Sequence, residues 1–308
     1  MLLNSLSIII PTKDRGNVFN KTLRAAYEAT NNIMSEILII NDSKTNSIHI
    51  EEKYTDRVMV LDNPKRGVAS ARNYGAKNAI YNHLLFLDDD IIITENNITE
   101  LLINAEQYPN TAINFNWIYP SELIDKISNS QFGRYLIKNG FTSLKGWSNN
   151  LKWNDEKLFE PDLIASYFLF INKQNFNMVG GYNEKFPHAG AEDFEFAKRL
   201  KKSNIKGICN PLVKVLHNEA DRVDLIPWLQ RKERAAETRK IAVNIGNEEM
   251  IIRTTQIKKK LILFIYFNKP VLFFVLKCLP NNRKIDFIYF KIVNRLLSAY
   301  LFKGYFKN

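Results

Sequence analysis

Three consecutive carboxylates, Asp88, Asp89 and Asp90, follow the apolar run His83–Leu87 and lead directly into Ile91–Ile93. Adjacent carboxylates repel one another and lose hydration at a partly buried strand end, so a cation or hydrogen-bond donors must compensate them. Oxygen ligands suit Mg²⁺ or Mn²⁺, which usually take further ligands from substrate phosphates. The triplet therefore predicts a metal site for a phosphate-bearing substrate, with a solvated acidic turn as the alternative.

A second acidic pair, Glu192 and Asp193, follows His188–Ala191 and begins a segment with helical spacing. Acidic side chains at a helix start have an ordinary explanation, because they meet the positive end of the helix dipole. The pair alone therefore does not establish a second functional cluster. It is a candidate only in combination with other features of the chain.

The first hundred residues alternate short apolar runs with helical patterns. We expect an α/β fold with a mostly parallel sheet covered on both faces, because near-continuous apolar strands separated by helices are typical of such sheets. Ligands bind beyond the carboxyl ends of these strands, so Pro11–Arg15, Asp42 and the triplet should converge on one crevice. The expected strands are Leu6–Ile10, Ile37–Ile40, Val58–Leu61, Leu84–Leu87 and Ser166–Ile171, and the expected helices are Asn17–Thr30 and Val68–Tyr81.

Composition favours a folded protein in a reducing compartment. The chain has 308 residues with 45% apolar content, which is enough for a large core. Its two cysteines, Cys209 and Cys278, match no metal or redox spacing and provide no disulfide framework. The run Met1–Ile10 lacks the basic region and cleavage site of a signal peptide, so we expect a cytoplasmic location.

The last part of the chain carries the entire net charge. Residues 251–308 hold 12 Lys and Arg against one acidic residue, whereas residues 1–250 hold 31 basic and 31 acidic residues. Basic residues alternate there with aliphatic and aromatic clusters, a pattern that an anionic membrane surface attracts. A helical dimer or domain-packing face is the alternative, and it would make the protein a homo-oligomer.

Two other partners fit the basic tail less well. The apolar run Leu261–Leu276 is interrupted by Lys269 and Pro270 and is shorter than the ~20 residues of a membrane span. Nucleic acid is not an expected partner, because its bases need accessible aromatic platforms, whereas these aromatic residues lie among aliphatic ones.

Taken in order, several fragments resemble the family 2 glycosyltransferases, inverting enzymes with the GT-A fold. The resemblance covers roughly residues 5–220. The segment Gly180–Leu200 is also similar to β-1,4-galactosyltransferases and chondroitin-synthase-type enzymes, which implies a galactose-type or N-acetylhexosamine donor. The fragments are Ser7–Arg15, Ile39–Ser43, Gly67–Asn73, Phe86–Asp90, Gly180–Tyr182 and Gly190–Asp193.

For the nucleotide, the resemblance implies a pocket formed by the first two strands and the helix that starts near Val68. Pro11, Thr12 and Asp14 would line this pocket. Asp42 would accept a hydrogen bond from the base, usually uracil. Arg72 would reach the nucleotide or its phosphates.

For the chemistry, the resemblance implies a metal side and an acceptor side. Asp88 and Asp90 would be the outer members of a DxD motif, with Asp88 facing the ribose and contributing to the metal site, and Asp90 holding Mn²⁺ or Mg²⁺ on the diphosphate. Asp193 would be the catalytic base, with Glu192 positioning the acceptor. His217 stands where some members place a further metal contact, although a lone histidine after a strand is more often packed or solvated.

The resemblance also implies a domain plan. Residues 1–220 would form the GT-A domain, with a nucleotide-binding half at 1–100 and an acceptor-side half at 101–220, and residues 221–308 a helical extension. Between Asn114 and Asn154 the pattern is irregular, and Trp117, Trp147 and Trp153 either form an acceptor-side wall or simply pack.

The predicted activity is metal-dependent, inverting transfer of a sugar from a nucleotide-sugar donor, probably a UDP-hexose or UDP-N-acetylhexosamine in this family, to a glycan or lipid-linked saccharide. The enzyme would lie peripherally on the inner face of the cell membrane. Two alternatives are a sugar nucleotidyltransferase and a non-catalytic membrane-associated scaffold. The first should carry a glycine-rich basic loop, which Pro11–Gly16 does not supply, and the second need not keep the carboxylates of both sites.

Overall fold

The protein is described from a computed structural model that covers residues 5–147 and 153–307. It divides into two compact units. The first unit comprises the chain up to Pro120, Ser143–Pro187 and Glu192–Glu219. The second takes Ser121–Thr142 and His188–Ala191 from within the predicted catalytic domain, together with the chain from Ala220.

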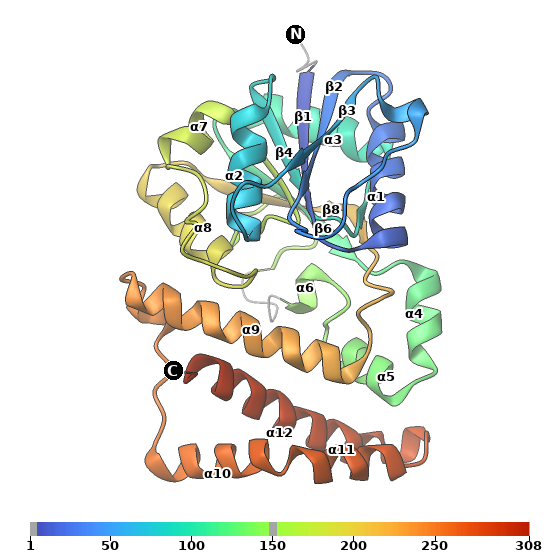
Figure 1. The fold of residues 1–308 in the computed structure, drawn as a ribbon, viewed down its shortest axis with the longest axis vertical. Coiled ribbons are helices and arrows are strands. Elements are labelled where there is room, and N and C mark those ends of the chain that lie inside the picture. Colours follow the sequence, from blue (N-terminus) through green and yellow to red (C-terminus); the bar gives the residue numbers. More distant parts are fainter. Residues whose placement is uncertain (1–4, 148–152, 308) are drawn as a thin grey trace. The chain divides into compact units, whose positions relative to one another are not determined.

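The first unit contains one eight-stranded sheet in the order β3-β2-β1-β4-β7-β6-β8-β5. The four strands from β3 to β4 are parallel, as predicted, but β7 runs antiparallel to both β4 and β6. The sheet is therefore mixed, and helices flank it (Figure 1). The strands are β1 (Ser5–Thr12), β2 (Met34–Asn41), β3 (Val58–Asp62), β4 (His83–Leu87), β5 (Ile91–Ile92), β6 (Ala112–Ile118), β7 (Phe168–Asn172) and β8 (Gly207–His217).

The predicted helices of this unit are present with small changes in their bounds. The helix expected at Asn17–Thr30 spans Gly16–Ala29, and the one expected at Val68–Tyr81 ends at Asn78. The segment that begins with the second acidic pair is helical, as expected. The helices are α1 (Gly16–Ala29), α2 (Val68–Asn78), α3 (Glu95–Gln107), α6 (Leu144–Trp147), α7 (Lys173–Met178) and α8 (Glu192–Lys202), with a short 3₁₀ helix at Glu52–Tyr54.

The prediction of irregular structure over Asn114–Asn154 is wrong. The segment contains most of β6 and three helices. The strand was hidden by its polar residues, because the Asn114 amide is buried and donates to the carbonyl oxygen of Phe168 at 2.6 Å. Trp117 lies in β6 and is buried, so it packs within the sheet. The side chain of Trp147 and residues 148–152 lie outside the described part of the chain.

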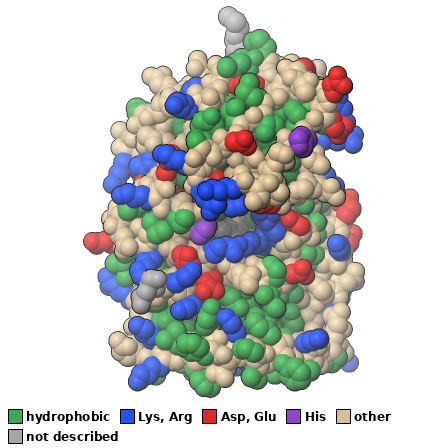
Figure 2. All heavy atoms as spheres, in the orientation of Figure 1, with side chains coloured by type: hydrophobic (Ala, Val, Ile, Leu, Met, Phe, Trp, Pro, Cys, Tyr) green, Lys and Arg blue, Asp and Glu red, His purple; other side chains and the backbone are tan. Residues whose placement is uncertain are grey.

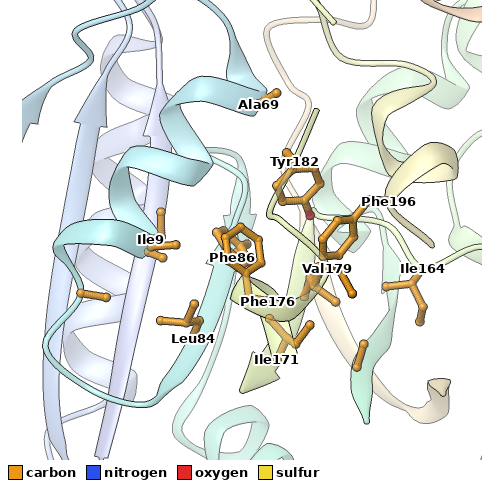
Figure 3. Close-up of a cluster of buried hydrophobic side chains, with 14 of the residues drawn as sticks. Ile9, Ala69, Leu84, Phe86, Ile164, Ile171, Phe176, Val179, Tyr182 and Phe196 are labelled. Carbon is orange, nitrogen blue, oxygen red and sulfur yellow. The ribbon is translucent and has the colours of Figure 1, made fainter. Parts of the chain in front are cut away.

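A buried cluster connects α2, α7 and α8 to the sheet (Figure 3). The Phe86 ring of β4 lies 5.1 Å from the Phe176 ring of α7, and Tyr182 stacks on Phe196 of α8 at 4.4 Å. Helix α2 approaches β1 closely, since a Cβ at Gly75 would lie 2.4 Å from a methyl carbon of Ile9. These contacts hold the starts of α2 and α8 in place, and both helices carry predicted site residues.

The second unit is helical, which confirms the predicted helical C-terminal region. Its core is an aromatic and aliphatic cluster that includes Trp228 and Leu296. Arg134 and Asp286 form a bidentate ion pair at 2.6 and 2.8 Å that links α5 to α12. The helices are α4 (Ser121–Ser128), α5 (Gln131–Lys138), α9 (Leu225–Asn244), α10 (Gln256–Phe267), α11 (Lys269–Cys278) and α12 (Asp286–Tyr305), with 3₁₀ turns at Glu248–Met250 and Arg283–Ile285.

Candidate active site

The acidic triplet forms the turn between β4 and β5, at the carboxyl end of β4. β5 pairs antiparallel with β8, so that Ile91 lies opposite His217. The backbone N–H of Asn218 donates to the carbonyl oxygen of Asp90 at 2.7 Å. This pairing brings the end of β8 beside the triplet, although the two segments are far apart in the sequence.

The middle carboxylate, Asp89, is held inside the first unit. Thr12 donates its hydroxyl to Asp89 Oδ2 at 2.6 Å, and Arg15 Nε lies 3.4 Å from Asp89 Oδ1. Burial, together with the neighbouring charge of Asp90, raises the pKa of Asp89 to about 7. Asp89 therefore fixes the turn, and the outer carboxylates of Asp88 and Asp90 are the ones placed for ligands.

Asp90, His217 and Glu219 form a cluster that could hold a metal ion. One ligand atom from each lies within 4.8 Å of the others, and His217 Nε2 is 3.1 Å from Asp90 Oδ1. The hydroxyl of Tyr119 donates to Glu219 and orients it. Carboxylates suit Mn²⁺ and Mg²⁺, and imidazole is a ligand of transition metals, so this mixed set fits Mn²⁺ better than Mg²⁺.

Two cationic groups lie beside Asp90. Arg15 Nη2 is 2.7 Å from Asp90 Oδ2, and Asp90 Oδ1 faces His217. Burial lowers the pKa of His217, but the carboxylates of Asp90 and Glu219 outweigh burial and raise that pKa to about 9. Because only a neutral imidazole binds a metal, metal binding at this cluster is coupled to release of the His217 proton.

Arg72 of α2 joins the acidic triplet to the second acidic pair. Its guanidinium is 2% exposed and donates to Asp88 Oδ1 at 2.9 Å and to Glu192 Oε1 at 3.3 Å. It lies 4.0 Å from Asp193 Oδ1 and 5.2 Å from the centre of the Tyr182 ring. One buried cation therefore contacts carboxylates from both predicted clusters. Its engagement with three carboxylates also differs from the predicted direct contact with the nucleotide or its phosphates.

Asp193, near the start of α8, is held by Ser166. The Ser166 hydroxyl donates to Asp193 Oδ1 at 2.6 Å and the Ser166 backbone N–H donates to Oδ2 at 3.2 Å. Burial raises the pKa of Asp193 against the opposing effects of Arg72 and Ser166. A carboxyl group with a raised pKa is a stronger proton acceptor, as general-base catalysis requires.

The predicted nucleotide-binding residues gather where β1 and β2 end. Pro11 is buried in β1, and the backbone N–H of Asp42 donates to the carbonyl oxygen of Thr12 at 2.9 Å. Asp42 Oδ1 accepts hydrogen bonds from the Asn63 amide at 2.7 Å and the Gly67 backbone N–H at 3.0 Å. Asp42 thereby orients the loop that precedes α2.

Asp14 lies just beyond β1 in the left-handed backbone region, with φ of 55°. Its Oδ1 accepts from the Asn46 amide at 2.6 Å, and this hydrogen bond is the main reason that the pKa of Asp14 is lowered. Asp14 therefore ties the β1 loop to the loop after β2. The Thr12 hydroxyl on Asp89 connects the same end of β1 to the triplet.

All ten predicted site residues lie in the first unit, and their individual roles stay predictions. Sequence reasoning gave no role to Arg15, Ser166 or Glu219. Glu219 had a usable signal, since it follows His217 by two positions and residues two apart in an extended chain face the same side. Ser166 had no signal, because an isolated serine before a strand carries no recognisable spacing.

The chain was compared with protein families. Residues 7–173 match the model of glycosyl transferase family 2, which is more than half of the 308 residues. Residues 158–223 match a model described as the N-terminal domain of galactosyltransferase. The fold and the acidic site thus define a glycosyltransferase. The chain belongs to glycosyl transferase family 2.

Three curated relatives are similar over part of their length. The O-antigen biosynthesis protein RfbC of Myxococcus xanthus is 23% identical over 73% of this chain, and the chondroitin synthase of Pasteurella multocida is 28% identical over 63%. An uncharacterized glycosyltransferase of Haemophilus influenzae is 26% identical over 63%. The chain covers 18%, 23% and 61% of these proteins, respectively, so it spans less than two thirds of each relative.

Solved structures share the GT-A fold. The mannosyltransferase PcManGT from Pyrobaculum calidifontis, in complex with GDP-Man and Mn²⁺, aligns over 98% of this chain and 87% of its own with a TM-score of 0.57 and 11% identity. GalNAc-T7 with UDP, GalNAc and Mn²⁺ aligns over 70% of this chain and 43% of its own with a TM-score of 0.50 and 18% identity. The predicted fold class is confirmed.

We expect His217→Ala and Glu219→Gln each to weaken Mn²⁺ binding in the presence of UDP by at least about tenfold, because each removes one ligand of a three-residue site. The loss of the free Mn²⁺ signal in electron paramagnetic resonance measures this binding. His49→Ala is the matched control, since His49 is exposed in the loop after β2. Wild-type affinity in both site variants would show that the metal binds elsewhere.

Replacing Arg72 should expose the repulsion among the carboxylates that it joins. We expect Arg72→Met to lower the free energy of unfolding by about 3–5 kcal/mol at neutral pH, because it leaves buried charges uncompensated. The loss should shrink as the pH falls, since protonated carboxyls need no cation. Urea unfolding at both pH values tests this, with the exposed Arg66→Met as control. A loss that does not change with pH would contradict the electrostatic explanation.

Proposed function

We propose that the chain is a metal-dependent, inverting glycosyltransferase that moves a hexose or N-acetylhexosamine from a UDP-sugar to a hydroxyl of a glycan or lipid-linked saccharide. One observation carries the proposal. The Arg72 guanidinium contacts Asp88 of the triplet as well as Glu192 and Asp193 of the second pair, so a metal side and a base side belong to one site.

On the donor side, Asp42, Thr12 and Asp14 lie at the ends of the first strands, where the nucleoside would bind. Asp90, His217 and Glu219 would hold Mn²⁺ or Mg²⁺ against the diphosphate. When bound, the metal stabilises the negative charge that develops on the leaving diphosphate. Arg15 beside Asp90 would have to move or share the carboxylate with the metal, since its Nη2 is 2.7 Å from Asp90 Oδ2.

On the acceptor side, Asp193 would take the proton of the attacking hydroxyl. Ser166 holds both carboxylate oxygens through its hydroxyl and backbone N–H, which fixes the direction of the carboxylate. Arg72 keeps Glu192 beside it. Attack on the anomeric carbon from the face opposite the diphosphate would invert that carbon in a single displacement, so a UDP-α-sugar would give a β-linkage.

The comparisons support this class of reaction without deciding the donor. GalNAc-T7 was solved with UDP, GalNAc and Mn²⁺, whereas PcManGT was solved with GDP-Man and Mn²⁺. The match to a galactosyltransferase domain over residues 158–223 and the chondroitin synthase relative support a galactose-type or N-acetylhexosamine donor.

For the acceptor, we propose a saccharide of surface-polysaccharide synthesis, reached from the inner face of the cell membrane. The relative RfbC is an O-antigen biosynthesis protein. The basic and apolar C-terminal helices support a peripheral membrane location. Among the described residues, no single helix is long and apolar enough to cross a membrane, but α10 and α11, bent by 59°, reach that length and composition together.

The experiment that tests the function is a donor screen. We expect Mn²⁺-dependent release of UDP from UDP-galactose, UDP-N-acetylgalactosamine or a related UDP-sugar, accelerated by a saccharide acceptor, and a β-linked product by NMR. An α-linked product would contradict single displacement. If no nucleotide sugar releases its nucleotide in the presence of Mn²⁺ and a range of acceptors, the chain is a non-catalytic scaffold.

Variants separate the two sides of the site. Asp193→Asn should lower transfer by about 10²–10⁴-fold while UDP binding stays near wild type, because it removes only the proton acceptor. Asp90→Ala should instead abolish Mn²⁺-dependent binding of the donor, measured by calorimetry. Asp155→Asn, at an exposed carboxylate, is the control. Lost UDP affinity with retained transfer in Asp193→Asn would contradict its assignment as the base.

A further inference from the structure

Helices α10 and α11 expose an unusual number of large apolar side chains. Ile257, Phe264, Phe267 and Phe274 are 82%, 64%, 74% and 68% exposed. Every phenylalanine among the exposed large hydrophobic residues belongs to α10, α11 or α12. We call this surface the apolar C-terminal face, and it consists of Ile257, Leu261, Phe264, Phe267, Val271, Phe274, Val275, Phe287 and Ile288.

The exposed residues follow the helical period. In α10, Ile257, Leu261 and Phe264 are separated by four and three positions, so they form one stripe, and Lys258 and Lys260 flank it. In α11, Val271, Phe274 and Val275 form a corresponding stripe. An apolar stripe with flanking lysines is typical of a helix that lies in the plane of a membrane interface.

The opposite sides of the two helices are anchored in the second unit. Tyr266, Leu272, Phe273 and Leu276 pack against its hydrophobic core. The Tyr266 hydroxyl also contacts the Glu233 carboxylate at 3.2 Å. The apolar C-terminal face therefore cannot be turned inward without breaking that core, and it is exposed because the helices are already packed on their other side.

The charge around this face has a single sign. Residues 251–308 carry 12 basic side chains and one acidic side chain, Asp286, which is paired with Arg134. Figure 2 shows hydrophobic side chains over the C-terminal helices with Lys and Arg scattered among them. A surface that combines exposed phenylalanines with unbalanced basic charge is complementary to anionic lipids.

We propose that the apolar C-terminal face docks on an anionic lipid bilayer, with the phenylalanines in the interface and the lysines on the lipid headgroups. The inference specifies the surface behind the proposed membrane location, and it does not rest on the identity of the transferred sugar. It also assigns α10 and α11 to the interface and not to a span, because Lys258, Lys260 and Lys277 are exposed along them.

Vesicle flotation with the full chain tests the inference. Binding to vesicles of equal parts phosphatidylcholine and phosphatidylglycerol should be strong in low salt, weaker in high salt, and weaker with phosphatidylcholine alone. Changing Phe264, Phe267 and Phe274 together to Gln should weaken binding by at least about tenfold, because interfacial binding scales with buried apolar area. Wild-type chain that fails to float with anionic vesicles would overturn the proposal.

The matched control changes three exposed apolar residues of the first unit, Met34, Met59 and Ile80, to Gln. This variant should bind vesicles like wild type, and equal weakening in both triple variants would overturn the assignment of the face. Release of UDP from a soluble donor is measured in parallel. Retained release without vesicle binding would reject only the docking surface, whereas vesicle binding without release would reject only the proposed reaction.

A thiol probe reports insertion directly. Cys278 is exposed at the end of α11 and Cys209 is buried, so a fluorescent maleimide should label Cys278. We expect its emission to shift to the blue on anionic vesicles and to be quenched by spin-labelled lipids. If the label is silent and the phenylalanine variant instead dissociates a dimer in sedimentation equilibrium, the face is a protein interface and the proposal is wrong.

Discussion

The buried guanidinium of Arg72 is the interaction on which the site depends. Removing a cation from water costs several kcal/mol, so it persists only where carboxylates compensate it. Here they come from the turn after β4, through Asp88, and from the start of α8, through Glu192 and Asp193. Because one side chain contacts all three, segments about a hundred residues apart in the sequence must meet. The requirement to neutralise Arg72 therefore also sets the geometry of the site.

Hydrophobic packing gives this polar network a fixed frame. Tyr182 lies against the Arg72 guanidinium on one side and stacks on Phe196 of α8 on the other. Phe86 immediately precedes the last residue of β4, and its ring packs against Tyr182 at 5.7 Å. The aromatic cluster thus connects the strand that delivers the acidic triplet to the helix that delivers Asp193. A change in this core would move both sides of the site.

The sequence predicted the parts of the fold and site that have short-range signals. Apolar runs predicted the first four parallel strands, and the acidic triplet indicated their ligand-binding end. Long-range pairing was not readable, so the antiparallel β7 and the partnership of Ser166 with Asp193 were missed. β6 was missed because Asn114 is buried and satisfied by backbone carbonyl groups, which breaks the apolar pattern. Glu219 was overlooked although its spacing from His217 was visible.

The central claim is that the metal-side and base-side carboxylates share one site. Paramagnetic broadening by Mn²⁺ in amide NMR spectra tests it directly, with Mg²⁺ as the diamagnetic reference. We expect the amides of Asp90 and His217 to broaden first, and those of Ser166 and Asp193 to broaden with them, while Met34 at the start of β2 is unaffected. Sharp Ser166 and Asp193 signals beside a broadened Asp90 would contradict a shared site and the reaction proposed for it.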